Sequence, residues 1–219
     1  MLGYQLVIGW LIAFFTMSYL LCNYLKLNSP LLITIFIWSF LMLFVFIFEM
    51  LILYYYKYLE QKGKHYYDTN TCYWNDASVK LIDCLTGIMY MDLYADYSLS
   101  DKRYCEHITT EGFRFVATGE VIHGIFCFIM SSIILYFYFF NFNEIYIYLS
   151  AIIYSAIQFA LITWYLSSTF LEMNFCKNDK FWFPPLLWNA PWVFIPLYII
   201  YESIKEIIKK ENCIIKSKD

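Results

Sequence analysis

Long apolar runs, separated by polar breaks, make up most of this chain. A helix needs about 20 residues to cross roughly 30 Å of hydrocarbon, and five runs are long enough. They cover residues 6–25, 31–56, 113–140, 145–171 and 181–204. The pattern predicts an all-α fold, a polytopic membrane protein whose five transmembrane helices form one bundle with an intramembrane cavity. No internal repeat divides the chain, so residues 1–219 are expected to form a single domain.

The polar breaks predict how these runs connect. Proline and asparagine stop the helix in the short turn at residues 27–30. The connection at residues 141–143 is tighter still and forces its two helices into an antiparallel pair. A long polar section, residues 57–111, separates the second run from the third. Within it, residues 79–97 look amphipathic and are predicted to lie against the membrane interface or to cap the bundle.

Composition narrows the class of protein. Hydrophobic residues make up 61% of the chain, more than a soluble domain can bury, so lipid must be the solvent for much of it. The formal net charge of −3, with no basic block outside the C-terminal tail, argues against a nucleic-acid partner. The seven cysteines form no CxxC and no Cys/His ligand spacing, so no metal site is expected.

Lysines at the C-terminal end predict the orientation in the membrane. Residues 205–219 contain five lysines and few acids. The positive-inside rule places this basic tail in the cytosol. Five spans then put the N-terminus and residues 57–111 on the opposite, lumenal side.

Two acidic residues interrupt the apolar runs. Glu49 lies in the second run and Glu120 in the third, where a charged carboxylate costs about 2.5–3.5 kcal/mol at the helix centre. Glu49 lies seven residues before Tyr56, and Glu120 lies seven residues after Phe113. At about 1.5 Å rise per residue, both carboxyls are expected at one depth, roughly 10 Å inside the same membrane face.

Each acid has a structural and a functional interpretation. Glu120 and His123 share a helical face and could simply join two helices, with Gly119 and Gly124 allowing close approach of a helix or a flat ligand. Glu49 could bond a tyrosine or an open backbone carbonyl. As a pair, however, two nearby carboxyls cannot both ionise cheaply, so one is expected to keep a proton that it can donate.

The fifth run concentrates proline and tryptophan. It holds four of the five prolines, each of which removes a backbone donor and tends to kink the helix. Asn189 and Trp192 are three residues apart near the depth of the acids, and an indole face in a dry cavity stabilises a cation. Trp188 is a further candidate for ligand contact, although packing against lipid is favoured for it. Gln158 in the fourth run either lines the cavity or bonds a neighbouring helix.

Outside the apolar runs, one short motif carries opposite charges. Asp101 and Arg103 lie two residues apart, followed by Tyr104. The pair predicts a structural clamp within the loop in preference to a ligand contact. Tyr104 is nevertheless kept as a candidate ligand contact.

Two segments of this chain resemble the emopamil-binding protein family, part of the broader EXPERA group. These are Tyr97–Tyr104 (YSLSDKRY) and Trp188–Pro196 (WNAPWVFIP), with Glu120 between them. The resemblance runs from the second predicted helix to the fifth and includes the five-helix layout. It implies that Glu49 and Glu120 are the two membrane acids of the family, and that Asn189 and Trp192 face a sterol.

The family includes sterol Δ8–Δ7 isomerases of the endoplasmic reticulum membrane. The resemblance implies protonation of the Δ8 double bond at C9, a cation centred on C8, and loss of a C7 proton to leave the Δ7 alkene. No cofactor is required, because there is no net oxidation. The expected catalytic residues are Glu49, Glu120, Asn189 and Trp192. The expected ligand contacts are His123, Tyr104, Gln158 and Trp188.

This chain departs from the isomerases of the family in two places. The Gly-Pro pair that usually follows the third-helix glutamate is missing, replaced around Phe126 and Cys127, and one position of the second helix differs. The isomerases carry a histidine one helical turn before the second-helix glutamate, where this chain has Val45. His123, one turn after Glu120, is a candidate replacement imidazole. The alternatives to an isomerase are a binding protein for sterols or cationic amphiphiles that does not convert them, and a membrane protein whose acids only lock helices together. The expected partners are a sterol or amine-containing hydrophobic ligand and the lipid bilayer, and a homodimer stays open.

Overall fold

The computed structural model describes residues 3–69, 73, 80–99, 101–171 and 183–216, and in this part of the chain all regular structure is helical. Among the described residues, four helices are long and apolar enough to cross a membrane. They are α1 (Gly3–Tyr24), α2 (Pro30–Tyr54), α6 (Glu111–Phe139) and α7 (Glu144–Leu171). These helices match the first four predicted runs to within three residues at each end.

The fifth predicted run falls within α8 (Phe183–Lys216), with its first two residues outside the described part of the chain. The helix does not end at residue 204, because the predicted basic tail continues as regular helix to Lys216. Lys205 pairs with Glu202 at 3.2 Å, one turn earlier, and Lys210 pairs with Glu144 at the start of α7. The i,i+3 pair of Lys205 with Glu202 and the contact of Lys210 with α7 stabilise this part of α8, which lies beyond the apolar run.

Local sequence explains where the long helices begin and turn. The Ser29 side chain accepts a hydrogen bond from the Leu32 backbone N–H, and Pro30 occupies the first turn of α2. Thr110 caps α6 in the same way through the Phe113 N–H. Asn141, with φ of 52°, makes the left-handed turn that joins α6 to α7.

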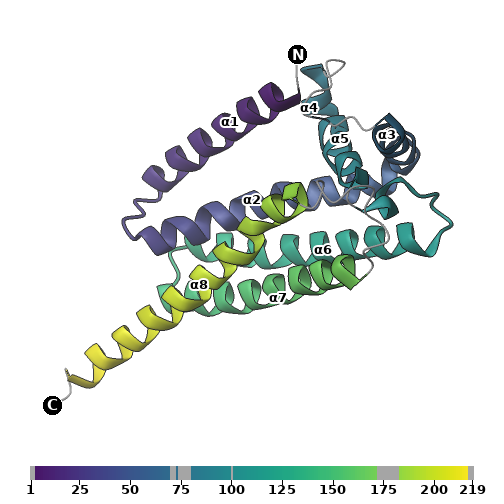
Figure 1. Cartoon of the computed structure of the whole chain (residues 1–219). Coiled ribbons are helices and arrows are strands. Elements are labelled where there is room, and N and C mark those ends of the chain that lie inside the picture. The colour runs from purple at the N-terminus through teal and green to yellow at the C-terminus, as the bar shows by residue number, and fades with distance from the viewer. Residues whose placement is uncertain (1–2, 70–72, 74–79, 100, 172–182, 217–219) are drawn as a thin grey trace.

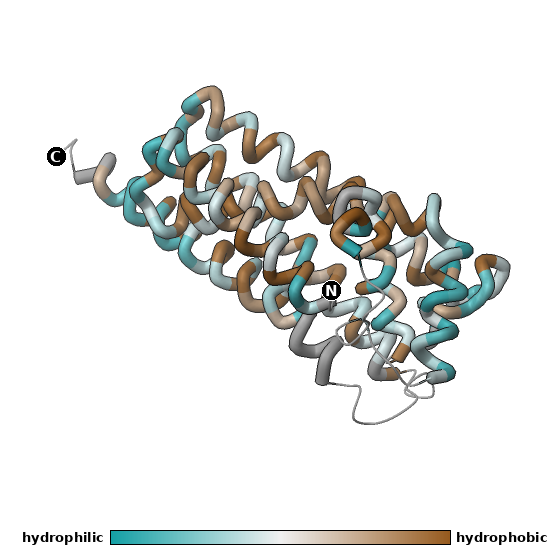
Figure 2. Tube along the Cα trace, turned by 90° about the horizontal axis from the view of Figure 1, so that it is seen from above, coloured by the Kyte–Doolittle hydropathy of each residue, from teal (hydrophilic) through white to brown (hydrophobic). Residues whose placement is uncertain are grey.

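The long helices form two closely packed pairs, α2 with α6 and α7 with α8, and α6 also contacts α7 (Figure 1). The Tyr138 hydroxyl of α6 donates a hydrogen bond of 2.6 Å to the Leu32 carbonyl of α2. α1 contacts α2 more sparsely, through aromatic rings such as Phe14, which stacks on Phe40 at 5.7 Å between ring centroids. Hydrophilic residues lie mainly towards the two ends of the long helices in Figure 2, as expected of a membrane bundle.

The polar section between α2 and α6 folds into short helices at one end of the bundle (Figure 1). They are α3 (Tyr56–Thr69), α4 (Ile82–Thr86), α5 (Ile88–Asp96) and two 3₁₀ turns, η2 (Tyr97–Leu99) and η3 (Lys102–Cys105). The amphipathic segment predicted at residues 79–97 is therefore two helices, split at Gly87. This glycine adopts φ of +81°, a left-handed conformation that other residues rarely take.

Candidate functional site

A pocket of about 380 Å³ lies between α2, α5, α6, α7 and α8. This volume falls within the range of about 300–1,000 Å³ that is typical of small-molecule sites. Aromatic and aliphatic side chains form most of its wall, and polar groups from several elements are set among them. The polar residues that line it are Glu49, Tyr90, Tyr94, Asp96, Tyr97, Tyr104, Glu120, His123, Gln158, Tyr165 and Asn189.

Glu49 of α2 reaches this pocket as a buried side chain, 2% exposed. Its Oε1 lies 2.7 Å from Nδ1 of His123, which α6 contributes. Its Oε2 is buried and has no hydrogen-bond partner among the described residues. The contact depends on Gly124, because a Cβ atom there would lie 2.7 Å from Glu49 Oε2. The predicted close approach at Gly124 is confirmed, and it brings α2 against α6.

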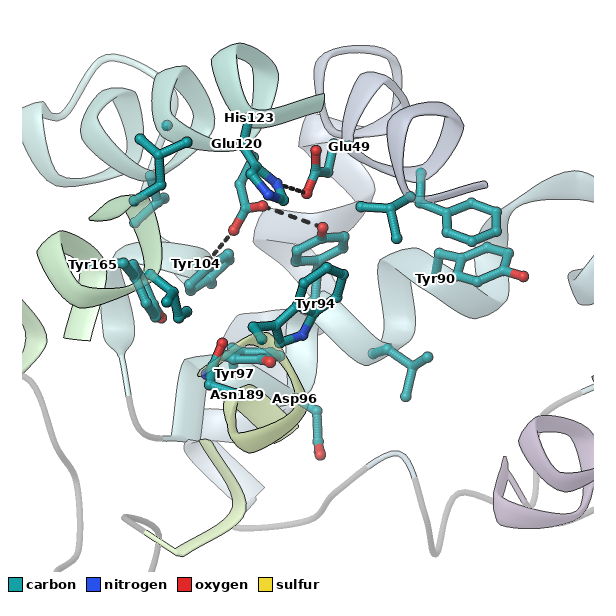
Figure 3. Close-up of a pocket in the computed structure, with 18 of the residues that line it drawn as sticks. Glu49, Tyr90, Tyr94, Asp96, Tyr97, Tyr104, Glu120, His123, Tyr165 and Asn189 are labelled. Carbon is teal, nitrogen blue, oxygen red and sulfur yellow. Dashed lines mark hydrogen bonds and ion pairs between the residues drawn. The ribbon is translucent and has the colours of Figure 1, made fainter. Parts of the chain in front are cut away.

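Glu120 of α6 is held by two tyrosines from the polar section. Its Oε1 accepts a hydrogen bond of 2.6 Å from the Tyr104 hydroxyl, and its Oε2 accepts one of 3.3 Å from the Tyr94 hydroxyl. Figure 3 shows Glu120 and the imidazole of His123 above the rings of these tyrosines. The helices of the polar section therefore cap the bundle and also complete the site.

Burial, followed by the nearby Glu120 carboxylate, raises the pKa of both Tyr94 and Tyr104 well above the ordinary value for a phenol. The same two causes raise the pKa of Tyr97. All three side chains therefore stay neutral at physiological pH, and each can donate its hydroxyl proton to an acceptor in the pocket.

The two carboxyls and the imidazole form one cluster. One ligand atom each from Glu49, Glu120 and His123 lies within 4.8 Å of the other two. This agrees with the shared depth expected for the acids. The spacing would let the three residues hold a metal ion, an arrangement that the sequence analysis did not predict. In the structure, each of them instead bonds to protein groups.

α8 contributes two of the predicted residues, Asn189 and Trp192, to the lining of the pocket. Asn189 is buried, and its side chain is hydrogen-bonded to Tyr97. The Trp192 ring meets the His123 ring edge-on, with centroids 5.9 Å apart, and lies 5.0 Å from the Trp38 ring. Trp188 belongs to α8, but its side chain lies outside the described part of the structure.

Gln158 has both of the roles considered for it, lining the cavity and bonding a neighbouring helix. Its side chain lines the pocket, and its Oε1 accepts a hydrogen bond of 2.7 Å from Trp38 Nε1, which ties α7 to α2. Its Nε2 lies 3.2 Å from the Tyr154 hydroxyl and 3.6 Å from Cys127 Sγ.

Asp101 and Arg103 form the predicted loop clamp. Arg103 Nε lies 2.7 Å from Asp101 Oδ1, and Nη2 lies 2.5 Å from Oδ2, with both side chains at most 2% exposed. Arg103 also bonds the Thr169 hydroxyl of α7 and lies over the Phe115 ring. The clamp fixes η3 against the bundle, and Tyr104 is thereby held in place beside Glu120.

Several residues of the site were not predicted from the sequence. Tyr94 and Tyr97 are three apart and could have been noticed as one face of a helix, but single aromatic residues carry little weight in a chain that is 23% aromatic. Cys127 and Trp38 gave no signal at all. Their roles depend on contacts with residues on other helices.

Comparisons with known protein families, with curated proteins and with solved structures find no match to this chain.

Proposed function

We propose that this chain is a sterol Δ8–Δ7 isomerase that moves a ring double bond by protonation and deprotonation. The observation that carries the proposal is the pairing of Glu49 with Glu120 on one wall of a largely apolar pocket that also contains Trp192. Shifting a double bond this way needs an acid, a base and a surface that tolerates positive charge. The resemblance of residues 97–104 and 188–196 to the emopamil-binding protein family supports the same reaction.

The unequal surroundings of the acids suggest their roles. Glu120 accepts hydrogen bonds from Tyr94 and Tyr104, and such bonds stabilise a carboxylate. Glu49 has a buried Oε2 with no partner among the described residues, a site for a proton. Glu49 would then protonate C9 of the Δ8 sterol, and the carboxylate of Glu120 would remove the proton from C7.

Trp192 is suited to the intermediate between these two steps. Protonation at C9 leaves a cation at C8, and an aromatic face within about 6 Å of a desolvated cation contributes about 2 kcal/mol or more. The indole lines the pocket beside His123. Under this proposal the protein is a multi-pass protein of the endoplasmic reticulum membrane, with five spans and the lysine-rich end of α8 in the cytosol.

The test is expression in a host strain that lacks its own Δ8–Δ7 isomerase, with the sterols followed by mass spectrometry. The proposal expects Δ7 sterols to appear, and expects the Glu120→Gln variant to abolish them at equal protein level. Persistence of Δ8 sterols, with the protein present in the correct membrane, would exclude catalysis.

A second function is favoured by one specific observation. Val45 lines the pocket where the isomerases of the family carry a histidine, and both nitrogens of His123 already contact protein groups. The chain could therefore bind sterols or cationic amphiphiles without converting them. This function predicts that a radiolabelled amine such as emopamil binds, that Glu120→Gln weakens the binding, and that no sterol is turned over.

A further inference from the structure

A row of hydrogen bonds runs behind the pocket wall and ends at Glu49. It starts at the Trp38 indole of α2, passes through Gln158 of α7 and Cys127 of α6, and reaches His123. The donor–acceptor distances are 2.7 Å, 3.6 Å and 3.3 Å in that order, and the last link, from His123 to Glu49, is 2.7 Å. Trp38, Gln158 and Cys127 are all buried.

The direction of the row is set by its first member. An indole N–H can only donate, so the Gln158 atom beside Trp38 Nε1 must be the oxygen. The Gln158 amide NH₂ then faces the Met42 sulfur and the Tyr154 hydroxyl, each at 3.2 Å, and Cys127 Sγ at 3.6 Å. In the last of these contacts the thiol sulfur is the acceptor, because an amide NH₂ only donates. The S–H bond is left to donate elsewhere, and the imidazole Nε2 of His123 at 3.3 Å is a better acceptor than the Met42 thioether at 4.0 Å.

We propose that this row fixes the tautomer of His123. If Nε2 accepts from Cys127, the ring proton must lie on Nδ1, which donates to Glu49 Oε1. Trp38, Gln158 and Cys127 are then positioning residues that act on Glu49 through His123. The tautomer itself does not depend on the proposed function, but its consequence rests on it. Because Oε1 is occupied as an acceptor, the proton that Glu49 transfers in the proposed reaction lies on Oε2.

The row of hydrogen bonds depends on how the helices of this bundle pack against one another. Cys127 and His123 are one turn apart on α6, and the partners at either end come from α2. The row therefore crosses α2, α7 and α6 and returns to α2. Trp192 contacts both Trp38 and His123, so the wall that faces a ligand packs against the first ring and the last of the row.

The experiment is NMR of the full-length protein in lipid nanodiscs, with histidine labelled with ¹⁵N in the ring. The chain has three histidines, and the His123→Gln variant identifies the signals of His123. We expect a protonated Nδ1 and an unprotonated Nε2, the minor tautomer of free histidine in water. A protonated Nε2 with a bare Nδ1, or a doubly protonated ring, would overturn the proposal. The measurement needs no ligand or turnover, so its outcome is independent of the proposed reaction.

Variants test whether the row causes the tautomer. Cys127→Ala should shift His123 towards the Nε2-protonated form, and Cys127→Ser, which restores a donor, should bring it back. Ser155→Ala is the matched control: this buried serine lies on α7 near Gln158, and its hydroxyl has no partner among the described residues. An unchanged tautomer in Cys127→Ala would contradict the role of the thiol. Trp38→Phe, which removes the first donor, should act in the same direction as Cys127→Ala.

An activity readout links the row to the proposed reaction. If Glu49 is the acid, Cys127→Ala should lower kcat about tenfold with KM unchanged, the effect of one lost hydrogen bond, and Cys127→Ser should recover most of it. A tautomer shift without an effect on kcat would keep the row but remove Glu49 from the proton transfer.

Discussion

Two clusters of ionisable groups, the buried clamp of Asp101 and Arg103 and the partly buried acid cluster of Glu49, Glu120 and His123, differ in how well their hydrogen bonds are satisfied. In the clamp, each carboxylate oxygen of Asp101 accepts from Arg103, whose guanidinium also meets Thr169 and the Phe115 ring. In the acid cluster, Glu49 bonds the His123 imidazole and Glu120 bonds Tyr94 and Tyr104, whereas Glu49 Oε2 has no partner among the described residues. A buried polar group without a partner costs free energy, so it calls for an explanation. In the clamp, both oxygens of the Asp101 carboxylate are hydrogen-bonded within the protein. In the acid cluster, Glu49 Oε2 still needs a proton or a ligand to satisfy it.

The largest expected effect comes from breaking the clamp. Arg103→Met leaves the Asp101 carboxylate buried without its partner, and removing one member of a buried ion pair costs about 3–5 kcal/mol. Thermal unfolding in detergent should show a large loss of stability for this variant, whereas Glu120→Gln should unfold near the wild-type temperature. Equal destabilisation by the two variants would contradict the contrast between the clusters.

The next largest effect tests the proposed catalytic role of the acid cluster. Glu120→Gln removes the proposed base, and general acid–base catalysis typically contributes about 10²–10⁴-fold to a rate. Sterol conversion by the purified protein should fall by about that factor. The control is Glu111→Gln, an exposed acid at the start of the same helix, which should leave the rate unchanged.

A smaller effect is expected from two glycines on α6. Gly124→Ala would place its Cβ 2.7 Å from Glu49 Oε2 and 3.2 Å from Glu49 Cβ, so either the Glu49 carboxyl or α2 must shift, and overpacking of this kind typically costs about 1–3 kcal/mol. Gly119→Ala would meet only Trp164, at an ordinary 3.7 Å, and should be neutral or slightly stabilising because alanine favours a helix. Unfolding temperatures measured side by side distinguish the two. A neutral Gly124→Ala would show that the contact between Glu49 and His123 does not need the close approach.

The smallest effect concerns alkaline pH. Burial and Glu120 raise the pKa of Tyr104 in the folded state, so the folded protein holds this proton more tightly than the unfolded chain. The stabilisation is complete below the unfolded pKa of about 10, and it is lost as the pH rises through the folded value. The unfolding temperature should therefore fall above about pH 10, and Tyr104→Phe should make that fall less steep. An identical slope in the variant would mean that other groups cause it.

The pattern of apolar residues predicted the four long helices of the described bundle, because lipid imposes a minimum length that can be counted. It predicted the polar section less well. Residues 79–97 read as one amphipathic segment, but Gly87 divides it, and α3 was not expected at all. Short helices have weak periodicity and depend on what they pack against, so their bounds could not be read from the chain.

The sequence by itself determined that two acids would lie at one depth of the bundle, because the rise per residue of a helix is constant. It also singled out His123, Asn189, Trp192 and Gln158 by their spacing or their polarity. Only the tertiary structure decided which groups meet: that Glu49 pairs with His123, that Tyr94 and Tyr104 hold Glu120, and that Cys127 lies behind the imidazole. The physical reason is that depth along a helix follows from counting residues, whereas rotation about its axis and contact between helices follow from packing of the whole bundle.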